Sequence, residues 1–299
     1  MKKYLCLISF AMVFLFGLSA FAEENEDYVV LSYDMTTRNV ITENLGKVSD
    51  TEYFQPTKAP AQNVRTIREI IGDDDRAVVK DTTVKPYSCI GYLRGQKYNG
   101  EITKTTAFLV SDSTVLTAAH NVFPLDQYKE FRFYPGYNSL EDVKAPYGYG
   151  TAQAIATIVH VPENYKEAYA KDDDVNLEKY DYALIELDKT LGNSAGWLPL
   201  AGYNTAYNEN TLVGRNVVIV GYPKATNHYM WRDKKPILSV STYLIGTKAD
   251  ATTGQNGGPM LISANNTYYV VGIYTNRTVN DVNYGRYITK KISELVAKY

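Results

Sequence analysis

The chain has 299 residues, of which 45% are hydrophobic, and its 31 basic and 33 acidic residues give a formal net charge of −2. The basic residues are not clustered, which argues against nucleic acid or an anionic membrane surface as the main partner. A chain of this length buries enough apolar surface to be stable without disulfides.

The first 22 residues predict a signal peptide. Two lysines form a basic start, residues 5–18 form an apolar core, and Ala-Phe-Ala at 20–22 is a cleavage site of the A-x-A type. The apolar stretch is too short to span a membrane comfortably. We therefore expect a secreted protein without a membrane anchor.

Cysteine is scarce, and its placement matters for both stability and chemistry. Cys6 lies inside the signal peptide, so its removal leaves Cys89 alone and the mature protein without an internal disulfide. The apolar neighbours of Cys89 indicate a small buried side chain. The weaker alternative is a nucleophilic Cys89 paired with His120.

Residues 23–68 differ in composition from the rest of the chain. They begin with acidic residues, and the run Gln-Pro-Thr-Lys-Ala-Pro-Ala-Gln at 55–62 is typical of a linker. Such a segment after a signal peptide predicts a pro-peptide, and Arg65 and Arg68 would suit a processing protease. The alternative is an extension that stays attached. The predicted organisation is a signal peptide over 1–22, a pro-peptide over 23–68 and one domain over 69–299.

From residue 70 onward, short strands are separated by turn signals. Residues 106–110 and 115–117 predict a hairpin around a Ser-Asp-Ser turn, and 182–187, 216–222 and 267–275 predict further strands. The last segment instead has the spacing of one helix face, with Thr289 as its cap; the apolar residues on that face are Ile292, Leu295, Val296 and Tyr299. The pattern predicts an all-β fold of two packed β-barrels with a C-terminal helix.

Two motifs indicate a catalytic pair. His120 follows a predicted strand and two alanines that let the backbone turn, and imidazole suits general-base catalysis near neutral pH. Asp181 begins an apolar run, where an unpaired carboxylate would be costly, so we expect it to accept the imidazole N–H. His160 and His228 stand in no such context and are interpreted as structural.

The run Gly-Gln-Asn-Gly-Gly-Pro at 254–259 has the frame of a serine-protease nucleophile loop, with Asn256 in place of the serine. Its glycines would let the amides of Gly254 and Asn256 converge on one point as an oxyanion hole. The run alone is weak evidence. Because it follows the histidine and aspartate motifs in this order and spacing, it strongly indicates a Ser-His-Asp system.

Over residues 69–299 the sequence resembles the bacterial glutamyl endopeptidases, the V8-like branch of the chymotrypsin-like serine proteases. The resemblance rests on short runs at 72–76, 180–182, 221–223, 254–259 and 283–290. It implies a fold of two six-stranded antiparallel β-barrels and removal of the pro-segment near Arg68-Glu69. It also implies that His120 is the general base, Asp181 its orienting carboxylate and position 256 the nucleophile.

The family's pocket for an acidic P1 residue carries a histidine and a threonine that this chain lacks. Tyr274 replaces the histidine, and Ala251, with Thr252 beside it, stands five positions before the nucleophile. These three are the candidate substrate-binding residues. Both departures weaken a preference for glutamate, because a tyrosine hydroxyl brings no positive charge to a carboxylate.

Asparagine cannot act as serine does, because its amide lone pair is delocalised and it offers His120 no hydroxyl proton. Loss of the nucleophile costs a protease about 10⁶ in kcat. One hypothesis is therefore an endopeptidase-family protein of impaired or no activity, changed recently at Asn256. The alternative is a non-catalytic homologue that binds peptides or proteins. Deamidation of Asn256 offers no route to efficient proteolysis.

We expect polypeptides as substrates or ligands, a monomeric protein, and no cofactor. The aspartate runs at 73–75 and 172–174 are hard oxygen ligands that calcium could use. Their spacing matches no EF-hand, and solvated acidic loops are the commoner outcome. We therefore expect no metal site.

Overall fold

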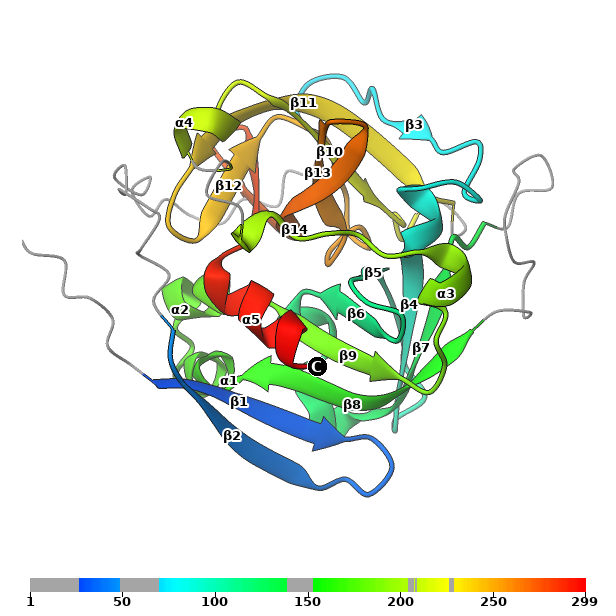
Figure 1. The fold of residues 1–299 in the computed structure, drawn as a ribbon, viewed down its shortest axis with the longest axis vertical. Helices are drawn as coiled ribbons and strands as arrows, with labels where there is room; N and C mark the ends of the chain where they lie inside the picture. Colours follow the sequence, from blue (N-terminus) through cyan, green and yellow to red (C-terminus); the bar gives the residue numbers. More distant parts are fainter. Residues whose placement is uncertain (1–26, 49–69, 139–152, 204–206, 208, 226–228) are drawn as a thin grey trace, which may run out of the picture.

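A computed structural model describes residues 27–48, 70–138, 153–203, 207, 209–225 and 229–299. The signal peptide, the linker-like run, Arg65, Arg68 and His228 lie outside these ranges. Strands dominate, and they form two stacked barrels in Figure 1, with the first below the second.

Six antiparallel strands close the first barrel. Their order is β8-β7-β4-β5-β6-β9, and a β8–β9 pairing completes the ring. The bounds are β4 Ile90–Lys97, β5 Ile102–Leu109, β6 Thr114–Thr117, β7 Tyr128–Pro135, β8 Ala154–Pro162 and β9 Ala183–Leu187. In β7, Phe131 and Phe133 are buried while Arg132 between them is partly exposed, which is the period-two alternation of a strand with one face in the core.

The second barrel repeats this arrangement. Its order is β10-β13-β14-β15-β12-β11, closed by a β10–β11 pairing, with the short β3 added to β11. The bounds are β3 Ala77–Val78, β10 Asn216–Gly221, β11 Trp231–Val240, β12 Leu244–Thr247, β13 Pro259–Ala264, β14 Thr267–Val279 and β15 Val282–Tyr287. The prediction of two six-stranded antiparallel barrels is confirmed.

The predicted strands correspond to β5, β6, β9, β10 and β14, and the predicted terminal helix is α5 (Lys290–Lys298). Ile292 and Leu295 of α5 are fully buried in the main core, where the helix lies against the first barrel (Figure 1). Thr289 occupies the N-cap position, but its hydroxyl makes no capping bond and is buried without a hydrogen-bond partner among the described residues. The position of the cap was predicted, whereas its hydrogen bond does not form.

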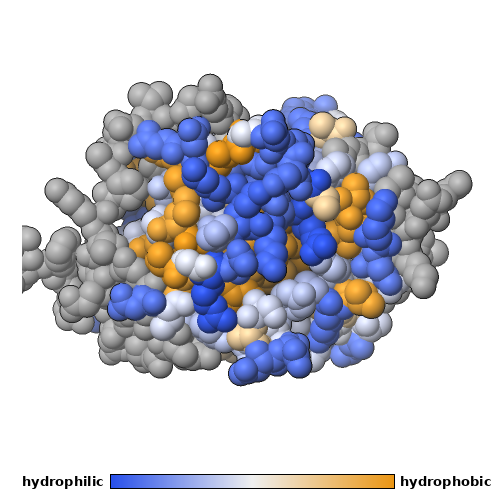
Figure 2. Space-filling model, turned by 90° about the horizontal axis from the view of Figure 1, so that it is seen from above, coloured by the Kyte–Doolittle hydropathy of each residue, from blue (hydrophilic) through white to orange (hydrophobic). Residues whose placement is uncertain are grey.

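Short helices connect the strands. They are α1 (Glu163–Lys171), α2 (Asp174–Lys179), α3 (Gly192–Ala195), α4 (Glu209–Leu212) and the 3₁₀ turns η1 (Tyr87–Cys89), η2 (Ala119–Asn121), η3 (Leu125–Gln127) and η4 (Ala201–Tyr203). In the described part of the chain, no helix is both long and apolar enough to cross a membrane. Seen from above, the outer face of the second barrel is mainly hydrophilic, with apolar side chains in small groups (Figure 2).

The segment predicted as a pro-peptide contains a β-hairpin that the sequence analysis missed. Strands β1 (Asp27–Asp34) and β2 (Val40–Lys47) pair with each other, and β1 also pairs with β8. The short apolar run Tyr-Val-Val-Leu at 28–31 carries the strand signal, although the acidic start of the segment obscured it. Part of residues 23–68 is therefore folded against the barrel.

Candidate active site

His120 and Asp181 form a hydrogen-bonded pair. The imidazole Nδ1 lies 2.7 Å from Asp181 Oδ2, and the His120 backbone amide donates to Asp181 Oδ1 at 3.0 Å. An ionised carboxylate only accepts, so Nδ1 carries the proton in this pair and Nε2 is left as the basic nitrogen. The pair is thus arranged as a base and its orienting carboxylate.

The local structure around the pair follows from the sequence. His120 lies in the turn η2, directly after β6, and the preceding Ala118 and Ala119 are fully buried, so only small side chains fit there. Asp181 lies between α2 and β9 and is 7% exposed. The His120 side chain remains 33% exposed, which leaves the imidazole accessible while its partner is shielded.

In the loop at 254–259, two glycines adopt a backbone conformation that favours glycine. Gly254 has φ +101° and Gly257 has φ +81°, both in the left-handed region. A Cβ on Gly257 would lie 2.2 Å from Thr117 Oγ1 and 2.3 Å from the Thr106 carbonyl oxygen. The glycines therefore allow both the turn and its close approach to the first barrel.

Asn256 is held beside His120 through its main chain. Its carbonyl oxygen accepts from the Thr106 amide at 3.1 Å and from Nδ2 of Asn121 at 2.9 Å. Asn121 directly follows His120. The loop of the second barrel is thus anchored to the first barrel at the residue next to the imidazole.

The Asn256 side chain is poorly accommodated. The residue is 8% exposed, and its Oδ1 is buried without a hydrogen-bond partner in the described residues. A buried, unpaired amide oxygen costs about 1–3 kcal/mol. The surroundings of position 256 therefore do not complement asparagine.

Two amides of the loop have no partner among the hydrogen bonds of the described chain: those of Gly254 and Asn256. The intervening Gln255 amide donates to the Thr252 carbonyl at 2.9 Å. The Gly257 amide donates to the Tyr274 carbonyl at 2.8 Å. The same bond occupies the nitrogen that would have to attack the Asn256 side chain in deamidation.

Arg76 braces the loop and was not identified as a site residue from the sequence, where it appeared only within the family run at 72–76. Its Nη1 donates to Thr252 Oγ1 at 2.7 Å and to Gln255 Oε1 at 3.0 Å. Its guanidinium pairs with Asp74 at 2.8 Å and lies over the Trp231 ring. Asp74 is two residues away, but Thr252, Gln255 and Trp231 are distant in sequence, so no local pattern could reveal that Arg76 contacts the loop.

The candidate substrate-binding residues fall into two groups. Tyr274 and Ala251 are both fully buried in the apolar cluster of the second barrel. Thr252 is partly exposed, and its hydroxyl is engaged by Arg76. Of the three side chains, Thr252 alone presents surface in this structure, and the role of all three in substrate binding stays a prediction.

The remaining histidine and cysteine candidates have structural environments. His160 is 1% exposed and lies 2.8 Å from both Ser32 Oγ and Glu186 Oε1. Cys89 is fully buried, and its Sγ lies 3.3 Å from the Ala195 carbonyl oxygen. Burial raises the pKa of the Cys89 thiol to about 11, which disfavours the thiolate that a nucleophile requires.

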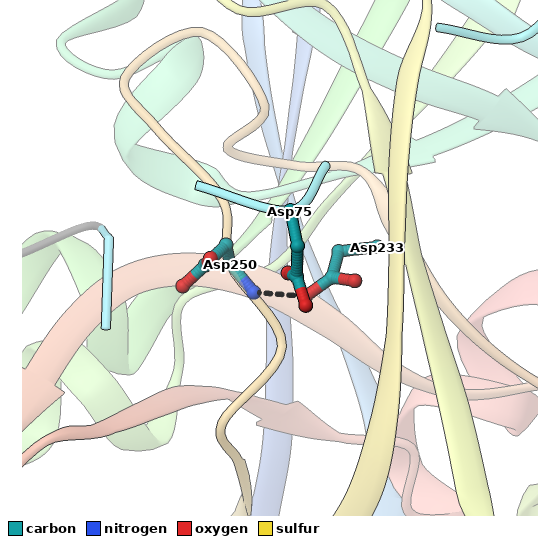
Figure 3. A group of neighbouring side chains, drawn as sticks. All are labelled: Asp75, Asp233 and Asp250. Carbon is teal, nitrogen blue, oxygen red and sulfur yellow. Dashed lines mark hydrogen bonds between the residues drawn. The ribbon is translucent and has the colours of Figure 1, made fainter. Parts of the chain in front are cut away.

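Three carboxylates gather on the second barrel. Oxygen atoms of Asp75, Asp233 and Asp250 lie within 4.8 Å of one another (Figure 3). Asp233 accepts from the backbone amide of Asp250 at 2.7 Å, and Asp75 pairs with Lys235. Burial, reinforced by the neighbouring Asp233, Asp75 and Asp74, raises the pKa of Asp250. In the parts of the chain that the structure describes, this is the one group of three side chains placed so that they could ligate a metal ion.

The other aspartate run has a capping role. Asp172 ends α1 in the left-handed conformation, with φ 54°. Asp173 is the N-cap of α2, and its carboxylate accepts from the Asn176 amide at 3.2 Å. The run at 172–174 is thus explained by the joint between two helices.

Comparison with known proteins places this geometry in a family. The model of the trypsin-like peptidase domain matches residues 105–273, which contain His120, Asp181 and the glycine loop. The chain belongs to the trypsin-like peptidase family. Its fold and resemblance make it a V8-like member of the chymotrypsin-type serine proteases, as predicted.

Two curated proteins are similar in sequence to this chain over most of its length. A glutamyl endopeptidase of Bacillus licheniformis is 28% identical over 258 residues, covering 83% of this chain and 74% of the relative. A protein named extracellular metalloprotease, of Bacillus subtilis, is 32% identical over 256 residues, covering 80% of this chain and 76% of the relative.

Solved structures of related proteases share the fold. The structure of a Glu endopeptidase in complex with MPD superposes with a TM-score of 0.61 and 25% identity, covering 77% of this chain and 98% of that one. The protease Anisep from Arthrobacter nicotinovorans gives a TM-score of 0.56 at 19% identity, covering 75% of this chain and all of that one.

Proposed function

We propose that this chain is a secreted endopeptidase-type protein whose catalytic machinery is complete except for the nucleophile. The observation that carries the proposal is the contrast at one site. The His120–Asp181 pair is formed, whereas Asn256 places an unpaired amide oxygen where a serine hydroxyl belongs. The protein as it stands is a very poor hydrolase.

Each remaining group has a defined task in acyl transfer. His120, oriented by Asp181, would take the proton of a hydroxyl at position 256 and pass it to the leaving amine. The amides of Gly254 and Asn256 would stabilise the oxyanion of the tetrahedral intermediate. Asn256 supplies no such proton, so the first step fails although the other groups are present.

The decisive experiment compares the purified natural chain with Asn256→Ser and Asn256→Ala. Each is incubated with a mixed peptide library and with a serine-reactive phosphonate probe. We expect cleavage and labelling by Asn256→Ser alone, and their loss when His120→Ala is added. Robust cleavage or labelling by the natural chain would overturn the proposal.

A non-catalytic peptide-binding role is the second candidate. It is favoured by the amides of Gly254 and Asn256, which make no hydrogen bond in the described chain and could bind a peptide carbonyl oxygen without a nucleophile. Isothermal titration with library peptides would test it. Micromolar binding by the natural chain, together with an inert Asn256→Ser variant, would favour binding over lost catalysis.

We further propose that a glutamate preference is absent or weak. The Tyr274 side chain is fully buried among apolar residues and carries no positive charge. Profiling the P1 residue of peptides cleaved by Asn256→Ser tests this directly. Cleavage confined to glutamyl bonds would contradict it.

Export and processing complete the proposal. The basic and apolar pattern of residues 1–22 supports secretion, and Arg68-Glu69 is the proposed processing point. The net charge of −2 supports polypeptides rather than nucleic acid as partners, and we propose a monomer. N-terminal sequencing and light scattering of the exported protein would test the processing site and the oligomeric state.

A further inference from the structure

We propose that the N-terminal hairpin, residues 27–48, remains bound to the first barrel after the chain is cut between the two, and that it positions Asp181 from there. The inference rests on the proposed function in one respect: the cut between hairpin and barrel occurs in the natural protein only if the proposed processing does. The mature molecule would then contain two chains, with the hairpin as a permanent part of the fold.

The hairpin is joined to the barrel by a strand ladder. Five residue pairs between β1 and β8 are in antiparallel register, from Val30 opposite Pro162 to Asp34 opposite Ile158. The ladder continues at the turn, where the Met35 amide donates to the Thr157 carbonyl at 2.8 Å. Without β1, this edge of β8 would present unpaired backbone groups to solvent.

The apolar face of β1 is part of the main core. Five hydrophobic side chains of the hairpin segment join that core and are at most 7% exposed; they are Tyr28, Val30, Tyr33, Met35 and Val48. The outer strand β2 is different, since Val40 and Ile41 are 54% and 65% exposed. Strand β1 is therefore an interior element covered by β2, and its removal would uncover the barrel core.

Polar contacts anchor the hairpin at its turn and near the C-terminal helix. Arg38 in the turn donates to the carbonyl oxygens of Tyr128 and Lys129 at 3.2 and 2.8 Å. Glu43 on β2 pairs with Lys298 and accepts from the Tyr299 hydroxyl. Dissociation would have to break these contacts together with the β1–β8 ladder.

A third polar anchor lies under the middle of β1. Ser32 Oγ lies 2.8 Å from Nδ1 of the buried His160, whose Nε2 is 2.8 Å from Glu186. The His160 ring stacks on Tyr299 with centroids 3.7 Å apart. The structural histidine is thus shared between the hairpin, the barrel and the end of α5.

One contact links the hairpin to the catalytic pair. The hydroxyl of Tyr182 donates to the hydroxyl of Tyr28 at 3.2 Å, and the two residues are 0% and 1% exposed. Tyr182 directly follows Asp181, and its backbone amide is tied to the Tyr180 carbonyl at 2.8 Å. Tyr28 therefore helps to fix the segment that carries the orienting carboxylate.

The hairpin is located where it can support the first barrel but cannot obstruct the active site. It lies on the side of the first barrel away from the second barrel, whereas the site is where the two barrels meet (Figure 1). A segment placed there cannot block substrate by covering His120. Its effect on catalysis has to act through the barrel, with Tyr28 as a positioning residue.

The first experiment replaces part of the linker at 55–62 with the recognition sequence of a site-specific protease, in the exported chain with Asn256→Ser. After the cut, native size-exclusion chromatography and intact mass measurement follow both fragments. We expect co-elution in buffer and separation only in denaturant. Elution of the hairpin fragment on its own in buffer would overturn the proposal.

The second experiment tests the link to Asp181 with Tyr28→Phe, made together with Asn256→Ser. The change at Tyr28 keeps the ring and removes the hydroxyl. We expect a folded protein whose kcat is lower by roughly two- to tenfold with unchanged KM. The NMR resonance of the His120 Nδ1 proton should shift as well. Ile41→Ala, on the exposed strand β2, is the control and should change neither quantity.

The two readouts separate this inference from the proposed function. If Asn256→Ser proves inactive, co-elution and the His120 resonance still test the hairpin. An unchanged resonance and kcat in Tyr28→Phe would refute the positioning role. A shifted resonance with an inactive serine variant would uphold it while refuting the proposed catalysis.

Discussion

Nδ2 of Asn121 donates a 2.9 Å hydrogen bond to the main-chain oxygen of Asn256. Asn121 follows the base in sequence, so this bond sets the nucleophile position relative to His120 without involving the side chain at 256. The frame of the site is therefore independent of which residue stands there, and restoring a serine requires no backbone rearrangement.

Asn256→Ser should gain activity without loss of stability. Serine supplies the proton that His120 needs, and we expect kcat/KM to rise on the order of 10³-fold or more. Removal of the buried, unpaired Oδ1 should also leave the free energy of unfolding equal or higher by about 1 kcal/mol. Peptide hydrolysis and urea denaturation measure the two effects; a less stable serine variant would contradict the account of the site.

Asp181→Asn, made together with Asn256→Ser, should lower kcat by about 10⁴. An amide can hold the ring by donating to Nδ1, which puts the proton on Nε2 and removes the base. The matched control is Asp126→Asn, because Asp126 is exposed in the turn η3. Steady-state kinetics of the double variants decide the matter, and a loss below about tenfold would show that Asp181 does not orient the base.

Gly257→Ala should destabilise the protein more than Gly100→Ala does. Both glycines have positive φ, but a Cβ at 257 would meet Thr117 and Thr106, whereas nothing lies within 4 Å of one at 100. We expect about 1 kcal/mol for the control and at least 2–3 kcal/mol for Gly257→Ala. Equal midpoints in urea denaturation would mean that the loop does not pack against the first barrel as described.

Asp250→Asn should change how stability depends on pH. Burial raises the pKa of Asp250 above its unfolded value, so the fold favours the protonated form. Stability from this group is present below the unfolded pKa, about 3.9, and is lost as the pH rises through the higher folded pKa. The variant should therefore be more stable than the natural chain at pH 7, with little difference at pH 3.

Thermal unfolding between pH 3 and pH 7 measures this difference, with Asp126→Asn as the control for removing a surface carboxylate. Adding calcium in the same series shows whether the Asp75, Asp233 and Asp250 group binds the ion, because binding would raise the unfolding midpoint. A midpoint that falls in Asp250→Asn at pH 7 would show that the ionised carboxylate is stabilising, which contradicts the cost assigned to its burial.

Local patterns accounted for a large part of the fold. Strands such as β5, β9 and β10 were predicted because short apolar runs bounded by turn residues are local properties. The first strand β1 was missed because residues 23–68 were interpreted as a polar pro-peptide. That interpretation rested on the acidic start at residues 23–27 and the linker at 55–62. The helices α1 and α2 were not predicted either, and the cap residue Asp173 with Asn176 was a signal that could have indicated α2.

The amino-acid sequence by itself determined the family, the order of His120, Asp181 and the glycine loop, and the substitution at Asn256. These are properties of residue type and spacing along the chain. Only the tertiary structure decided that Arg76 braces the loop, that Tyr274 is buried, and that Tyr28 contacts Tyr182. The physical reason is that such contacts join residues far apart in sequence, and they form only when closure of the barrels brings those residues together.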